Sequence, residues 1–198
     1  MTALVKMIKK EHELEAISQA VKSAIVSALA EGTDVARAVS TTLARALAES
    51  LPVSKISNAR MAIVTASIAS AAINGVLQSG CELAPATQGL LVPIVRGTQL
   101  HGCEILAAAT RASKIVTRAV AEGQRDLAAA VTGLIRGAIQ GANEIGTDAA
   151  DAATAAASGA LNAVGDVRSS AYQTVLAAVI MPFDGIIITP REPAISSN

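Results

Sequence analysis

The stretch GCELAPATQGLLVPIVRGTQLHGCEI, residues 80–105, contains nearly the same four letters twice, GCEL at 80–83 and GCEI at 102–105. The interval of 22 residues continues along the chain, because an acid recurs in the same column at Glu82, Glu104, Asp126 and Asp148. EGTDVARAV (31–39) fits the same columns, and ESLP (49–52) is a four-residue insertion before the next block. A repeat of this regularity predicts one architecture for the whole chain.

The composition favours helices. Hydrophobic residues make up 52% of the 198 residues and aromatic residues only 1%, so alanine, valine, isoleucine and leucine must fill the core. Alanine-dominated chains of this kind are typical of α-helical proteins. We expect an all-α protein built as antiparallel helical hairpins or a bundle on 22-residue repeats. Residues 1–52 would form N-terminal amphipathic helices, 53–181 the helical repeats and 182–198 a C-terminal tail.

The repeat is compatible with helices that turn at the glycines and with helices that run through them. Eleven residues over three turns is about 3.67 residues per turn, which keeps equivalent columns on one face of a continuous helix. EGTD (31–34) and IGTD (145–148), however, place a glycine where helices often end, before threonine and aspartate that suit the next N-cap. Pro85 would lie in the first turn of such a helix, where its missing N–H costs little. We therefore expect helices of about 15–25 residues that end at the glycines, with long continuous helices as the alternative.

Cys81, His101 and Cys103 are the candidate metal ligands, with Glu82 and Glu104 next to the thiols. Thiolate, imidazole and carboxylate groups all bind zinc. In one straight helix the two thiols would lie about 33 Å apart, so a shared site needs a hairpin between them. No CxxC or HxxxH pair anchors a site locally. We interpret the cysteines as small residues in one repeat column, and expect neither a metal nor a cofactor.

The column of acids could supply paired carboxylates for acid–base chemistry, but the preceding glycines favour N-caps of helices. The sequence contains neither GxxxxGK[ST] nor GxGxxG, the usual phosphate-binding patterns. We find no catalytic constellation and predict that the protein is not an enzyme.

Sixteen basic and sixteen acidic residues balance to a net charge of zero, which does not favour a nucleic acid as partner.

The segment GLIRGAIQG, residues 133–141, spaces Gly133, Gly137 and Gly141 four residues apart, and Gly159 stands in a similar row of small residues. Small residues at this spacing let two helix backbones approach closely, as they do in pairs of membrane helices. We predict that these four glycines are helix-packing positions. Arg136 argues against a location of this segment in lipid.

Two uncharged stretches raise the question of a membrane. From Met61 to Cys81 there are 21 residues without a charge, which is enough to cross a hydrocarbon core of about 30 Å. Polar residues such as Asn74 and Gln78, and the lack of an aromatic belt, make its insertion unfavourable. The second stretch, residues 169–183, leads to the candidate contacts with lipid or a partner, Phe183, Ile186, Ile187 and Ile188. The alternatives for the run 186–188 are a short strand and a tail that caps the core, and we favour the tail.

The stretch GAIQGANEIGTDAADAATAAASGALNAVGDV, residues 137–167, resembles uncharacterised bacterial Ala/Gly-rich helical repeat proteins in which a GAxxGAxxxGxD-type unit recurs. That resemblance implies a helical repeat and no catalytic residues. More distantly, the amphipathic alanine-rich pattern is similar to phasins, which coat storage granules. It is also similar to the helical scaffold subunit of some hydrogenases, which offers an apolar passage to a quinone.

High hydropathy without a charge bias predicts a non-enzymatic structural or scaffold protein. Its apolar stripes would serve self-association, giving a homo-oligomer, and contact with a membrane or another hydrophobic surface. The alternative is a helical binding module that encloses an apolar ligand, a quinone or an acyl chain, for a redox partner. Charge precedes any apolar run long enough for a signal peptide, so we expect a cytoplasmic protein or one peripheral to the inner membrane.

Overall fold

Each 22-residue unit of the central repeat is one helix and one turn. The computed structural model describes residues 2–51, 56–165, 169–183 and 185–188. They form the helices α1 (Thr2–Ala30), α2 (Val35–Ser50), α3 (Asn58–Ser79), α4 (Leu83–Leu100), α5 (Ile105–Glu122), α6 (Leu127–Ile145), α7 (Ala149–Val164) and α8 (Ser170–Val179). The prediction of an all-α fold is confirmed.

The turns lie at the repeat glycines. Gly32, Gly80, Gly102 and Gly146 all have φ between 64° and 74°, the left-handed conformation that only glycine adopts without strain. In the equivalent column Gln124 takes the same conformation, with φ of 50°. Each of these residues follows a helix and reverses the chain within a few residues. The chain therefore turns at the glycines, and the alternative of long continuous helices is wrong.

The start of α3 differs from the repeat register expected for it. A block that begins at Val53 would place the capping column at Arg60, but the N-cap is Ser57, whose side chain accepts a hydrogen bond from the Arg60 amide at 3.2 Å. A serine hydroxyl is a strong N-cap, and it sets the boundary three residues earlier than the repeat does.

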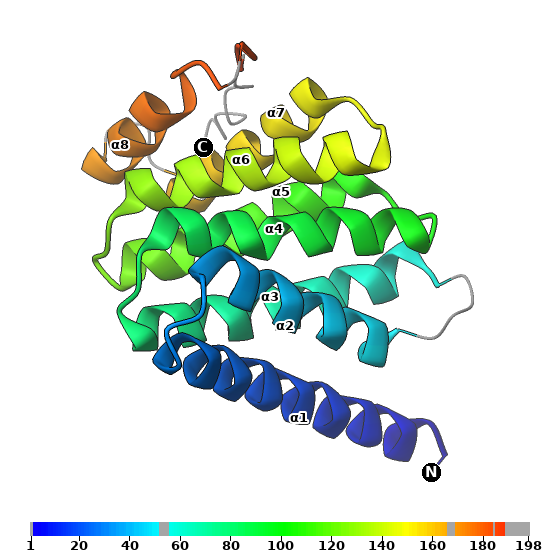
Figure 1. Cartoon of the computed structure of the whole chain (residues 1–198). Helices are drawn as coiled ribbons and strands as arrows, with labels where there is room; N and C mark the ends of the chain where they lie inside the picture. The colour runs from blue at the N-terminus through cyan, green and yellow to red at the C-terminus, as the bar shows by residue number, and fades with distance from the viewer. Residues whose placement is uncertain (1, 52–55, 166–168, 184, 189–198) are drawn as a thin grey trace.

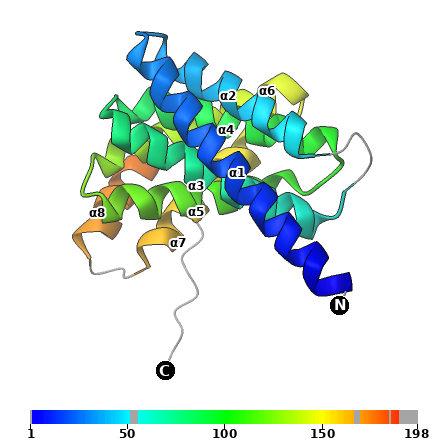
Figure 2. The same ribbon diagram turned by 90° about the horizontal axis from the view of Figure 1, so that it is seen from below.

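The helices stack in two layers (Figure 1). One layer contains α1, α3, α5 and α7, and the other contains α2, α4, α6 and α8. The view from below shows α2, α4 and α6 on one side and α3, α5 and α7 on the other (Figure 2). Every helix packs most extensively against the helix two places along the chain in its own layer. The helices α1 and α2 thus belong to the same array as the repeats that follow them.

Helices two places apart run parallel to each other. Contacts between α6 and α4 advance in the same direction along both, from Gly133 on Ala84 through Gly137 on Gln88 to Gly141 on Val95. Consecutive helices form hairpins, as expected, but the main packing is between parallel partners from different hairpins. The physical reason is that the small residues lie on the faces that meet within a layer.

The core lies between the two layers. Its largest fully buried side chains come from helices of both layers and are mostly aliphatic. They include Ile25, Leu43, Ile68, Ile73, Leu90, Leu91, Ile94, Leu134, Ile135 and Leu161. Tyr172 and Phe183, the two aromatic residues of the chain, are also buried and lie at the C-terminal end of the array.

Candidate interaction surfaces

The candidate metal ligands are placed at opposite ends of α4. Cys81 lies in the turn before α4, and His101 and Cys103 lie in the turn after it. Eighteen helical residues rise by about 27 Å, so the two thiols cannot share an ion. No group of three or more His, Cys, Asp or Glu side chains in the described part of the chain is arranged to hold a metal.

Both thiols are directed at backbone carbonyls. The Cys81 Sγ lies 3.9 Å from the Val76 oxygen, and the Cys103 Sγ lies 3.7 Å from the Ile56 oxygen. Burial raises the pKa of the Cys81 thiol, and a backbone hydrogen bond and the Arg125 guanidinium lower it in part. A thiol with a raised pKa is protonated at neutral pH and is a weak nucleophile, so this site is poorly suited to covalent chemistry.

The column of acids consists of N-cap residues. Glu82, Glu104, Asp126 and Asp148 each immediately precede a helix. The Asp126 carboxylate accepts a hydrogen bond from the Ala129 amide at 2.9 Å, and the Asp148 carboxylate accepts two, from Ala150 and Asp151. The two glutamates make no capping hydrogen bond with their side chains. Glu104 accepts one from the Asn58 side chain instead, across to α3, at 3.2 Å.

The predicted packing glycines all lie where two helices of one layer meet. A Cβ added to Gly133 would overlap the backbone of α4 at Ala84, and one added to Gly137 would lie 2.6 Å from the Gln88 oxygen. At Gly159 of α7 it would overlap the backbone of α5 at Thr110. Gly141 is less confined, because its nearest neighbour would be the Val95 side chain. Three of the four glycines thus allow direct contact between helix backbones.

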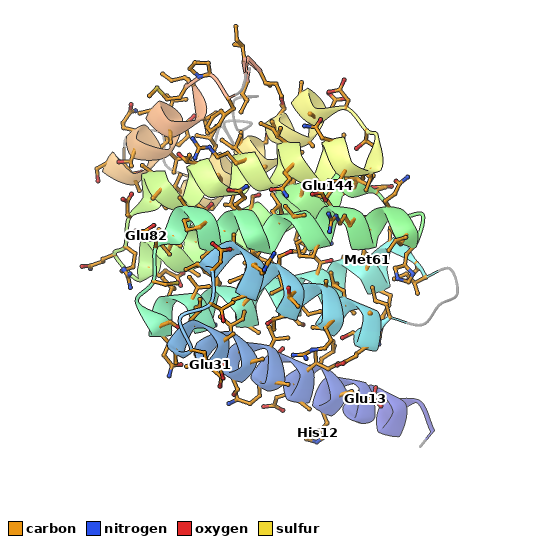
Figure 3. The ribbon with its side chains drawn as sticks, in the orientation of Figure 1. His12, Glu13, Glu31, Met61, Glu82 and Glu144 are labelled. Carbon is orange, nitrogen blue, oxygen red and sulfur yellow. The ribbon has the colours of Figure 1, made fainter. Side chains whose placement is uncertain are left out.

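Polar side chains join α4 and α6 on the outer face of their layer. The Gln88 amide donates to Gln140 and the Gln140 amide donates to Glu144, both at 2.9 Å. Glu144 in turn forms an ion pair with Arg96 of α4; Figure 3 shows Glu144 on α6, on the side next to α4. Both partners of the ion pair are partly exposed to solvent, so its contribution to stability is small. The network covers this face with polar groups.

A broad groove lies between α1 and α3. It has a volume of about 940 Å³ and extends to Ile115 of α5. Its lining includes Ser18, Gln19 and Lys22 of α1 and Ser67, Ser70 and Asn74 of α3. At its outer edge His12 lies on the free side of α1, with 77% of its side chain exposed (Figure 3). The groove is open to solvent and carries a mixture of small polar groups.

A second groove lies between α1 and α2 at the N-terminal end of the array, and we call it the α1–α2 groove. It has a volume of about 410 Å³ and is lined only by residues of these two helices. Its α1 side is aliphatic, formed by Ala16, Ile17, Ala20, Val21 and Ala24, whereas its α2 side carries Thr42, Arg45 and Glu49 beside Ala46. Apolar surface of this kind at an accessible site often marks a place of protein–protein contact.

The C-terminal segment is divided between the core and the surface. Phe183 and Ile188 are buried, and Ile186 is partly buried against the core. Phe183 and Ile186 exchange two backbone hydrogen bonds, at 3.1 and 2.7 Å. Ile187, by contrast, is 81% exposed, and Ile180 and Met181 just after α8 are 61% and 62% exposed. Of the four predicted contact residues, Ile187 alone is freely accessible, and the other three lie in or against the core.

One helix among the described residues, α3, is long and apolar enough to cross a membrane. It ends at Ser79, so the last two residues of the predicted span belong to the following turn. Within the structure 56% of its most apolar window is buried against other helices. A core helix of a water-soluble protein meets the same criterion, so the observation is weak evidence for a membrane span.

Comparison of the chain with protein-family models, with curated proteins and with solved structures found no match in any of the three. The resemblance to Ala/Gly-rich repeat proteins therefore remains a prediction.

Neither groove was predicted from the sequence, and the exposed pair Ile180 and Met181 was not predicted either. The grooves depend on how non-consecutive helices are placed, for which a single sequence carries no signal. The pair did carry a signal, because it ends the uncharged stretch before Pro182.

Proposed function

We propose that the protein is a non-catalytic scaffold that associates with itself and contacts a membrane or another hydrophobic surface. The observation that carries the proposal is the group of large aliphatic side chains exposed at the C-terminal end of the array, Ile180, Met181 and Ile187. Exposing them to water is unfavourable, and contact with lipid or protein removes that cost. A stacked array of helices also offers extended surfaces for partners, as helical repeat proteins do.

The net charge of zero determines what kind of membrane contact to expect. A basic protein binds anionic lipid through charge, and salt weakens such binding. Here the contact would rest on apolar side chains, so it should occur with neutral phosphatidylcholine vesicles and should persist at high salt. A localisation in the cytoplasm, or at the inner face of the membrane, is part of this proposal.

Flotation of the purified protein with phosphatidylcholine vesicles, at low and high salt, tests the membrane part. We expect salt-resistant flotation that falls several-fold in the double variant Ile180→Glu/Met181→Glu. The matched control is Leu100→Glu, which places the same charge on a side chain that is 83% exposed but lies in the turn after α4. A protein that stays monomeric at all concentrations and ignores vesicles would contradict the proposal.

The alternative, an enclosed apolar ligand for a redox partner, has less support. The grooves described above are open to solvent, and both are lined by polar as well as apolar groups. Lipid extraction of the purified protein followed by mass spectrometry would test this alternative. A quinone or acyl lipid in stoichiometric amount would favour the binding module over the scaffold.

A further inference from the structure

The array ends on two surfaces that no other described helix covers. Within one layer α4 packs on α2, α6 packs on α4, and α8 packs on α6. At one end of the described chain α1 and α2 have no earlier helix packed on them; at the other end α8 and the segment after it have no later one (Figure 1). The stacking interface is thus established three times within this layer and stops at both ends.

The N-terminal end presents the α1–α2 groove. Its α1 side is built from small and branched aliphatic residues, and its α2 side carries Ala46 together with Thr42, Arg45 and Glu49. The residues Ala16 and Ala20 are exposed, although the alanines and glycines of the middle helices are mostly buried in helix contacts.

The C-terminal end carries three exposed apolar side chains, Ile180, Met181 and Ile187, which we call the projection. Ile180 and Met181 form the turn after α8, and Ile187 follows on the short segment whose neighbours Phe183 and Ile188 anchor it in the core. The buried anchors hold the three exposed side chains at the end of the array. Large aliphatic side chains on a supported turn are suited to an apolar groove lined by alanines.

We propose that the C-terminal end of one copy, through Ile180, Met181 and Ile187, docks into the α1–α2 groove of a second copy, which continues the stacking from chain to chain. This inference rests on the proposed scaffold function and specifies how the self-association occurs. Because the two surfaces differ, the contact is head to tail, and every docked pair leaves one groove and one projection free. Such contacts build open chains or closed rings rather than a symmetric dimer.

Two variants that each block one end test the proposal. Ala20→Glu places a charged side chain in the groove, and Ile180→Glu/Met181→Glu places two charges on the projection. All three positions are exposed, so both variants should fold, which circular dichroism checks. The wild-type protein should show an average mass that rises with concentration above the 19.9 kDa of one chain. Each variant alone should remain at the mass of one chain, as measured by light scattering after gel filtration.

The decisive sample is an equimolar mixture of the two variants. The groove variant retains its projection and the projection variant retains its groove, so they should form a one-to-one complex of twice the mass of one chain that grows no further. The matched controls Ser23→Glu, exposed on α1 but outside the groove, and Leu100→Glu should associate as the wild type does. That set of results would support the proposal.

Other outcomes would overturn it. If Ala20→Glu associates normally while the projection variant does not, the C-terminal ends meet each other in a symmetric contact. If both variants associate like the wild type, the contact lies elsewhere and the scaffold function stands without this interface. If the wild type is monomeric at all concentrations, head-to-tail docking is excluded. The scaffold function then depends on vesicle flotation, and fails with it only if the protein also ignores vesicles.

Discussion

The contact of α6 with α4 and that of α1 with its neighbours are two versions of one packing scheme. In α6, glycines at intervals of four meet the backbone of α4, and most of the helix is buried. The helices α1 and α2 contain no glycine, and between residues 12 and 30 of α1 Val21 and Ile25 alone are buried. A groove remains between α1 and α2 at the end of the array. The comparison indicates that the backbones of two helices meet most closely where one of them carries a glycine, as Gly133 does against α4 and Gly89 does against α2.

The largest difference between the two regions should appear when a leucine is shortened. We expect Leu134→Ala in α6 to lower the free energy of unfolding by about 3 kcal/mol, since a fully buried side chain leaves a cavity. The same change at Leu14 of α1, which is only partly buried, should cost less than about 1 kcal/mol. Urea unfolding monitored by circular dichroism measures both. Equal losses would show that α1 is packed as tightly as α6.

A smaller effect should come from adding a methyl group to a glycine. Gly133→Ala forces α6 away from Ala84 and Thr87, and should cost about 2 kcal/mol even after the gain in helix propensity. The matched control is Gly97→Ala in α4, whose added Cβ would meet the end of the Leu47 side chain at 3.3 Å. That side chain is able to shift, so we expect Gly97→Ala to be neutral or stabilising by up to about 1 kcal/mol. A neutral Gly133→Ala would contradict close backbone packing.

The smallest effects should occur in the turns, and they should be alike in both regions. At Gly32 and Gly102 an added Cβ would meet no atom within 4 Å, so Gly→Ala tests backbone strain alone. Each change should cost about 1 kcal/mol because alanine resists a positive φ. The reverse change, Gln124→Gly, should stabilise the protein by a similar amount, about 1 kcal/mol. Melting temperatures of the three variants check this, and a destabilising Gln124→Gly would mean that the glutamine side chain contributes contacts of its own.

The elements that depend on short sequence signals were predictable. The repeat glycines marked the turns, Asp126 and Asp148 marked the N-caps, and Pro85 lies in the first turn of α4 as expected. These features are local, since a left-handed residue or a capping carboxylate acts within three or four positions. The row Gly133, Gly137 and Gly141 marked a helix contact for the same reason.

What the sequence did not reveal is which helices meet. The 22-residue period identifies equivalent helices but not that each one packs on the second helix along rather than on the next. The start of α3 was misplaced because the hydroxyl of Ser57 overrides the repeat register. The candidate surfaces follow from this arrangement: the α1–α2 groove combines side chains from two helices, and Ile187 is exposed only because Phe183 and Ile188 are held in the core.

The two-layer arrangement restricts how such a chain could change in length. Successive helices alternate between the layers, so inserting or deleting a single repeat would move every later helix to the opposite layer. Glycines that now face a backbone would then face a different surface, and the stacking would be lost from that point onward. Two repeats together would restore the alternation and simply lengthen the array. Chains of this architecture should therefore tolerate changes in steps of a helix pair, and an odd number of repeats should be selected against.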